Sequence, residues 1–235
     1  MRERIESALI RSTIVVGLVT GMAFAMPARA AAQNAATHVA PPTATLHGLT
    51  AGEWSARWWK WALETPASQN PLIDETGINC AVNQTGRVWF LAGLLGSGEV
   101  TRSCTVPEGT SLFFPVANAF CVPDPGTTGT FEDQRACASA FIATLISMQA
   151  ELNGVSIPNL SSYRALSPAF ALDFPEDDIF GVHDVTLQPA AADGFYLTVR
   201  PLPPGTHTIH VRAEFSTGEP GVTQVIDVTY NITVA

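Results

Sequence analysis

The sequence predicts an α+β protein with a mainly antiparallel, β-sandwich-like body and two packed helices. Two observations lead to this prediction. In three runs over the last forty residues, apolar side chains occupy every second position, which is the pattern of strands that bury one face. Two earlier segments, 51–64 and 130–153, place apolar side chains at helical spacing instead. One domain is expected, because single β-rich domains of about 200–250 residues are common.

The first helix is expected over residues 51–64. Thr50 and Glu53 have the spacing of a capping box, in which each side chain bonds the other residue's backbone N–H, and Pro66 ends the helix. Four tryptophans lie in this segment: Trp54, Trp58 and Trp61 on one face, and Trp59 beside it.

These tryptophans have two interpretations. The first is packing in the core, because a helix needs an apolar stripe to dock on a sheet and tryptophan is mostly buried in proteins. The second is a binding platform, in which Trp58, Trp59 and Trp61 stack against sugar rings and Trp59 is the most exposed of them.

Strands and a second helix are expected in the middle of the chain. The apolar runs 86–93 and 110–116 lie between glycines and prolines and are predicted to be buried strands. The second helix is predicted from about Thr130 to the pair Asn153 and Gly154, which suits a left-handed helix terminator. Its core-facing flank is expected to consist of Cys137, Phe141, Leu145, Met148 and Leu152.

The rest of the chain is predicted to be β-structure. Short strands are expected at 155–157, 170–174 and 182–187. The three alternating runs cover 195–199, 209–215 and 226–234. Because turn-forming residues separate them at 203–205 and 216–221, the runs are predicted to form an antiparallel meander.

The first thirty residues have the features of a secretory signal peptide. Basic residues precede an apolar stretch over 12–25, and Ala28, Arg29 and Ala30 form a small-x-small cleavage site. The alternative is a membrane anchor, which needs a longer apolar segment of about 20 residues. The predicted organisation is a signal peptide (1–30), a flexible leader (31–48) and a single disulfide-stapled domain (49–235). The mature protein is expected to be secreted or periplasmic, with no membrane span after cleavage.

All four cysteines follow the predicted signal peptide: Cys80, Cys104, Cys121 and Cys137. An even number of cysteines in an oxidising compartment favours disulfides. A zinc site is the alternative, but the close C-x-x-C pairs typical of such sites are missing. Three pairings are possible, and we prefer Cys80 with Cys104 and Cys121 with Cys137, because each pair closes a short loop.

The distribution of charge argues against nucleic acid as a partner. The formal net charge is −9, Lys60 is the only lysine, and the arginines are scattered. Proteins that neutralise phosphates need a basic patch or stripe instead.

Several short motifs mark a resemblance to a known family. They are W-W-x-W (58–61), G-x-V-W-F-L-A-G (86–93), R-x-C-x-V-P-x-G (102–109), F-F-P (113–115) and P-L-x-P-G-x-H-x-I (201–209). On these motifs the chain resembles an uncharacterised family of exported prokaryotic proteins. The resemblance implies export and one compact unit. It implies no activity, so no catalytic residue is carried over.

Acidic side chains between 173 and 184 could supply oxygen ligands for a cation. Asp177, Asp178 and Asp184 are the candidate ligands. The spacing of an EF-hand is absent, and a solvated acidic loop is the alternative. We expect no other metal site and no cofactor.

His207, His210 and Arg212 are candidate ligand-contacting residues on a predicted strand. Odd and even positions of a strand point to opposite faces, so His207 and His210 are not expected to bind one ion together. His207 is expected to face the core as a hydrogen-bonded structural group. His210 and Arg212 are expected on an outward polar face that is solvated or meets a partner.

No motif of a nucleophilic or zinc hydrolase is present, since G-x-S-x-G, S-x-x-K and H-E-x-x-H are all missing. The predicted function is therefore an exported, non-enzymatic binding or structural module, whose partner is a glycan or an envelope protein. The alternative is a secreted hydrolase, in which His183 or His207 works with acids from 173–184 in a surface cleft.

Overall fold

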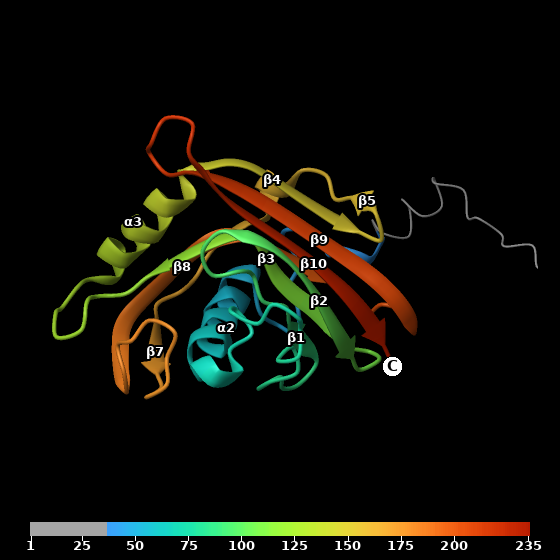
Figure 1. Ribbon diagram of the computed structural model, residues 1–235, viewed down its shortest axis with the longest axis horizontal. Helices are drawn as coiled ribbons and strands as arrows, with labels where there is room; N and C mark the ends of the chain where they lie inside the picture. The colour runs from blue at the N-terminus through green and yellow to red at the C-terminus, as the bar shows by residue number, and fades with distance from the viewer. Residues whose placement is uncertain (1–36) are drawn as a thin grey trace, which may run out of the picture.

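The computed structural model describes residues 37–235, so the predicted signal peptide and residues 31–36 of the predicted leader lie outside the described residues. Two five-stranded sheets pack against each other, and helix α2 (Ala51–Leu63) lies against the first of them (Figure 1). Most strand pairs are antiparallel. The predicted α+β class, with a mainly antiparallel body and two packed helices, is confirmed.

The first sheet is built around two long strands that are buried on both faces. Its strands are β1 (Val88–Phe90), β3 (Ser111–Cys121), β6 (Arg164–Leu166), β7 (Phe170–Phe174) and β8 (Val185–Val199). The order is β1-β3-β8-β6, and β7 also pairs with β8. Strand β1 is parallel to β3, and the other pairs are antiparallel. Burial on both faces explains why the sequence of β3 is almost continuously apolar.

The second sheet alternates buried and exposed side chains, because only one of its faces is covered. Its strands are β2 (Gly98–Val106), β4 (Leu145–Leu152), β5 (Val155–Ser156), β9 (Gly205–Ser216) and β10 (Thr223–Val234). The order is β2-β10-β9-β4-β5. Strand β2 runs parallel to β10, and the other pairs are antiparallel. Two short 3-10 helices, Ala67–Gln69 and Leu160–Tyr163, complete the fold.

The predicted three-stranded meander at the C-terminus is wrong in one respect. Strands β9 and β10 do form an antiparallel hairpin, but β8 belongs to the first sheet and pairs with β3, β6 and β7. Residues 200–204 therefore carry the chain from one sheet to the other. Alternation of side chains reports which face of a strand is buried and not which strand lies next to it.

The segment predicted to form the second helix is a helix in its first half and a strand in its second half. Helix α3 covers Phe131–Ile142 and begins with a capping box between Thr130 and Asp133, and β4 follows it. Asn153 and Gly154, expected to end the helix, both have positive φ and connect β4 to β5 as a two-residue hairpin turn. Asn-Gly serves both purposes, because it tolerates the left-handed conformation that each requires.

The expected core-facing flank of α3 also differs. Its buried side chains are Gln134, Ala138 and Ile142, whereas Phe141 is 60% exposed. The prediction assumed that one helix continued to residue 152 and buried a single flank along its whole length. Because α3 ends at Ile142, residues 145–152 do not determine which flank of α3 is buried.

The structure places part of the predicted leader against the body. Val39 bridges to Val199 of β8, and the backbone N–H of Ala40 donates to the Thr198 carbonyl (2.9 Å). Both Val39 and Ala40 are buried. Val39 thus joins the core, which the aperiodic composition of this stretch did not indicate.

The disulfides join Cys80 to Cys104 and Cys121 to Cys137, as predicted. The Cα–Cα separations are 5.9 and 6.0 Å. The first bond ties a long irregular segment to β2, and the second ties β3 to α3.

The hydrophobic core has two layers. One layer fills the space between the two sheets, and the other fills the space between the first sheet and α2. Successive residues of β3 therefore alternate between the layers, with Leu112 and Phe114 in the first and Phe113 in the second. Tyr196 of β8 is buried against α2.

Gly52→Ala is expected to destabilise the protein, although alanine normally favours a helix by about 1 kcal/mol over glycine. A Cβ at this position of α2 would lie 2.2 Å from the Leu166 carbonyl oxygen. The helix would have to move away from the first sheet, so we expect a loss of about 1–3 kcal/mol in the free energy of unfolding, measured by denaturation with guanidinium chloride.

Ala136→Gly, on the exposed side of α3, is the matched control. Only helix propensity acts there, so this change should cost about 1 kcal/mol. A stabilised Gly52→Ala variant would show that α2 does not approach β6 as closely as described.

Candidate functional site

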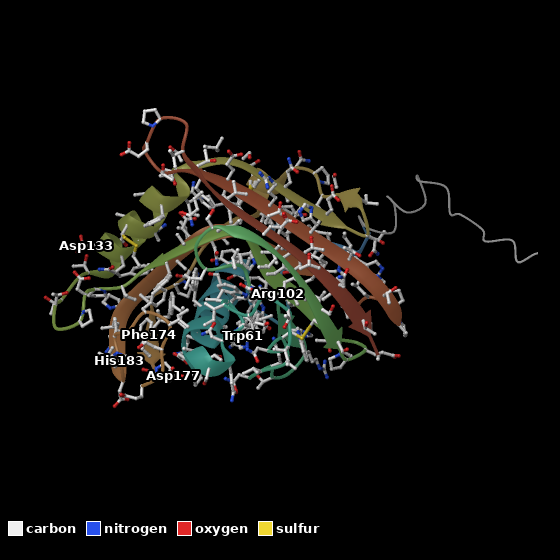
Figure 2. The ribbon with its side chains drawn as sticks, viewed as in Figure 1. Trp61, Arg102, Asp133, Phe174, Asp177 and His183 are labelled. Carbon is white, nitrogen blue, oxygen red and sulfur yellow. A yellow bond between two sulfur atoms is a disulfide. The ribbon has the colours of Figure 1, made fainter. Side chains whose placement is uncertain are left out.

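The four tryptophans of α2 lie inside the protein. Their side chains are between 1% and 8% exposed, and Trp59, expected to be the most exposed of its group, is 7% exposed. They pack among aromatic side chains of the first sheet; Trp59, for example, lies 4.5 Å from Phe120 between ring centroids. Figure 2 shows Trp61 in the interior, between α2 and the surrounding strands.

Each indole N–H also has a partner within the protein. The acceptors are the carbonyl oxygens of Leu46, Leu91 and Val82 for Trp54, Trp58 and Trp61, and the Tyr196 hydroxyl for Trp59. A buried Tyr196 favours its neutral form, so burial raises the pKa of its hydroxyl. These contacts support the core interpretation, because the four tryptophans of α2 are almost fully buried and each of their N–H groups is already bonded.

The candidate histidines on β9 point to opposite sides, as expected. His207 contacts the Pro203 carbonyl through Nε2 (2.9 Å) and the Asn153 amide through Nδ1 (3.1 Å). His210 and Arg212 both contact the carboxylate of Asp227 on β10, at 2.8 and 2.9 Å. The His210–Asp227–Arg212 group is a cross-strand ion-pair network, and neither of the two cavities described below includes it.

The acidic stretch 173–184 uses its carboxylates to hold its own backbone. Asp178 accepts N–H bonds from Phe180 and His183, both at 2.7 Å, and Asp177 accepts one from Ser68 at 3.0 Å. Burial opposes ionisation of Asp178, but the donated N–H groups outweigh it and hold its pKa below the usual value. The Ser68 N–H likewise lowers the pKa of Asp177.

These bonds give the candidate cation site at Asp177, Asp178 and Asp184 no support. Within residues 37–235, no group of three or more His, Cys, Asp or Glu side chains is placed to hold a metal ion. The Asp178 carboxylate meets the backbone N–H groups of Phe180 and His183 because the loop turns sharply at 181–184, where three residues have positive φ.

His183 is part of this loop and lines neither of the two cavities described below. Its Nδ1 contacts the Glu176 carbonyl at 2.8 Å, which raises its pKa, and the nearby Asp178 carboxylate adds to the rise. Figure 2 shows His183 and Asp177 together at one end of the molecule, near Phe174. His183 and His207 have separate local partners and line neither of the two cavities described below, whereas His183 Nδ1 lies 3.6 Å from a carboxylate oxygen of Asp178, so the hydrolase alternative stays a prediction.

The structure reveals an apolar cleft that sequence analysis did not identify. It has a volume of about 720 Å³ and lies between β3 of the first sheet and the ends of β9 and β10 in the second. Trp58 and Trp59 line it from α2, residues 93–96 line it from a loop, and Ala140 and Phe141 line it from α3.

Exposed hydrophobic side chains gather at this cleft. Leu95, Phe141 and Phe180 all line it, and they are 40%, 60% and 44% exposed. They come from three separate segments of the chain, so their proximity is a property of the tertiary structure. Large hydrophobic groups on a surface are unremarkable singly, but a shared apolar patch is typical of a binding site.

The cleft offers a ligand few free hydrogen-bonding groups. Thr144 donates to the Phe141 carbonyl, Thr217 to the Val222 carbonyl and Gln224 to the Gly96 carbonyl. Asn118 differs, since its buried Nδ2 has no hydrogen-bond partner although the amide lies near the Tyr196 hydroxyl. No Asp, Glu, His, Lys, Arg or Cys side chain lines the cleft.

Comparison with known proteins adds little to this geometry. No family model matches the chain, and no curated protein matches it. A cysteine protease inhibitor from Entamoeba histolytica is similar among solved structures, with 12% identity, a TM-score of 0.23, and coverage of 57% of this chain and 86% of that chain. A likeness of this size carries no argument about function, so the resemblance to an exported family stays a prediction.

None of the helices in residues 37–235 is both long and apolar enough to cross a membrane.

Proposed function

We propose that this protein is a non-enzymatic binding module that works outside the cytoplasm and holds a neutral, apolar small molecule in the cleft between its sheets. Two disulfides and the predicted signal peptide support the location. The observation that carries the proposal is the cleft itself, an apolar cavity rimmed by exposed Leu95, Phe141 and Phe180.

The lining of the cleft defines the class of ligand. A volume of about 720 Å³ falls within the range of about 300–1,000 Å³ that single small molecules occupy. A charged ligand would lose its hydration and find no ionisable partner, which is costly. A sugar would lose many hydrogen bonds to water, and most polar groups of the lining are already bonded within the chain. An apolar molecule meets neither penalty.

The same lining supports a binding role over catalysis. General acid–base chemistry needs a titratable side chain within hydrogen-bond reach of the reacting group. The cleft contains none of the residues that usually serve this purpose. Of the two partners expected from the sequence, a glycan fits the apolar cleft poorly. A protein partner would have to insert apolar side chains into the cleft.

Binding of N-phenyl-1-naphthylamine, an uncharged apolar fluorophore, tests the proposal. We expect its emission to rise on binding and the emission of Trp58 and Trp59 to fall by energy transfer, because both indoles line the cleft. Phe141→Asp places a charge at the rim and is expected to weaken binding by about tenfold, equivalent to about 1.4 kcal/mol.

Ile146→Asp is the matched control, since Ile146 is 56% exposed on the neighbouring strand and does not line the cleft. Both substituted side chains are exposed, so both variants should fold. Equal binding by the two variants, or no binding by the folded protein, would contradict the proposal.

A further inference from the structure

A second cavity lies along α2 and has a different chemistry from the apolar cleft. It has a volume of about 810 Å³ and is bounded by one side of the helix and by residues 83–90. Arg57, Lys60 and Arg87 line it, together with a single acid, Glu64. We call this cavity the α2 groove. Three basic side chains at one cavity are notable because the formal net charge of the whole chain is −9.

Lys60 is already neutralised within the groove. Its Nζ donates to the Glu64 carboxylate one turn along the helix and to the Ala171 carbonyl at 2.9 Å. A carboxylate oxygen of Asp173 also lies 3.8 Å from the Lys60 Nζ. The positive charge that remains for a ligand therefore belongs to the two arginines.

Arg57 and Arg87 are both exposed, and within the described part of the chain neither has a carboxylate within 4.0 Å. The Arg57 guanidinium lies 5.0 Å from the centroid of the Trp54 ring, and this cation–π contact holds it at the groove. Glu53, one turn back along the helix, interacts electrostatically with Arg57, but its carboxylate is bonded to Thr50 of the capping box at 2.8 Å.

The other arginines of residues 37–235 are engaged elsewhere. Arg135, Arg164 and Arg212 contact carboxylates, and Arg102 and Arg200 donate to backbone carbonyls. Arg57 and Arg87 are thus the two arginines of residues 37–235 with neither a carboxylate within 4.0 Å nor a hydrogen bond to a backbone carbonyl, and the fold brings them to one cavity from segments that are 30 residues apart.

We propose that the α2 groove binds a small organic dianion, whose two oxyanions are carboxylates or phosphates paired with Arg57 and Arg87. Guanidinium groups match both kinds of oxyanion, because each can donate two parallel N–H bonds. Neutral polar side chains, Asn83 and Thr85, line the same cavity and can accept or donate bonds to the body of the molecule. This site goes beyond the proposed function, since it shares no lining residue with the apolar cleft.

Calorimetric titration with two dianions and one neutral molecule tests the proposal. The probes are α-1,4-digalacturonate, symmetric dimethyl pyrophosphate, which carries one negative charge on each phosphate, and the uncharged α-1,4-galactobiose. We expect at least one dianion to bind with a Kd of about 1 mM or lower, and more weakly at high salt. Galactobiose should not bind in this range. The dianion that binds more tightly shows whether the groove prefers carboxylates or phosphates.

Arg57→Gln and Arg87→Gln are each expected to weaken binding about tenfold, since a hydrogen bond to a charged group contributes about 1.5 kcal/mol or more. Arg135→Gln, an exposed arginine on α3 outside the groove, should leave binding unchanged. Binding of N-phenyl-1-naphthylamine should be the same in all three variants, which separates this proposal from the proposed function.

Three results would overturn the proposal. The first is no binding of either dianion, and the second is equal binding of galactobiose. The third is unchanged dianion affinity when Arg57 and Arg87 are replaced together.

Discussion

Replacement of Arg102 by methionine is expected to lower the free energy of unfolding by about 3–5 kcal/mol. The Arg102 side chain is 1% exposed, and its guanidinium donates to the carbonyl oxygens of Asp74, Ala92 and Gly93 and to the Tyr230 hydroxyl. Methionine fills a similar space but donates no hydrogen bond. Several buried acceptors would then lose their partner, and each such loss costs about 1–3 kcal/mol.

Denaturation with urea, followed by tryptophan emission, measures this loss. Arg135→Met is the matched control, because Arg135 is exposed and its nearest carboxylate oxygen is 4.0 Å away. A surface substitution of this kind should change stability by no more than about 0.5 kcal/mol. Equal stability of the two variants would show that Arg102 does not hold the carbonyls described here.

Removal of the Cys80–Cys104 disulfide by a double change to alanine is expected to cost about 3 kcal/mol. The bond closes a loop with a sequence separation of 24, and in the chain-entropy account a closed loop of this size restricts the unfolded chain. Thermal or urea denaturation of the oxidised protein and of the double variant gives the difference. The Cys121–Cys137 bond, with a separation of 16, should contribute a similar amount.

Hydrogen exchange distinguishes the two disulfides. Loss of Cys80–Cys104 should speed exchange in residues 72–95, whereas loss of Cys121–Cys137 should speed it in α3. The same pattern of exchange in both double variants would contradict separate local roles for the two bonds.

Arg102 and the first disulfide act on the same part of the chain. Between α2 and β2 the backbone is mostly irregular, with one 3-10 turn and the three-residue strand β1. Such long connections are uncommon in compact domains. Buried polar side chains replace regular hydrogen bonding here; Asn70, for example, donates to the carbonyls of Ala62 and Thr65. This segment supplies walls of both the apolar cleft and the α2 groove.

Gly77 shows how closely this segment approaches β2. Its φ is +91°, and a Cβ would lie 2.3 Å from the Ser103 carbonyl oxygen. Only glycine combines this backbone conformation with such an approach. The positions of the binding surfaces thus depend on contacts between residues far apart in the sequence.

Local signals in the sequence were sufficient for several elements. The Thr50–Glu53 capping box and the tryptophan spacing predicted α2, and the alternation over 209–215 and 226–234 predicted the β9–β10 hairpin. The short loops between cysteines indicated the pairing. In each case the determining interaction joins residues close in the chain, so the pattern is visible in the sequence.

The tertiary structure decided the features on which the proposed function depends. Strand β8 lies in the first sheet and not in the predicted meander, because a strand buried on both faces favours the centre of a sheet. Residues 145–152 form a strand and not the predicted helix, because they pair with the edge of β9. The sequence by itself determined that the tryptophans share a helix face. Only the packing of α2 on the first sheet buried them, opened the apolar cleft beside them, and brought Arg57 and Arg87 to one groove. These outcomes depend on distances between segments remote in sequence, which no local pattern of residues records.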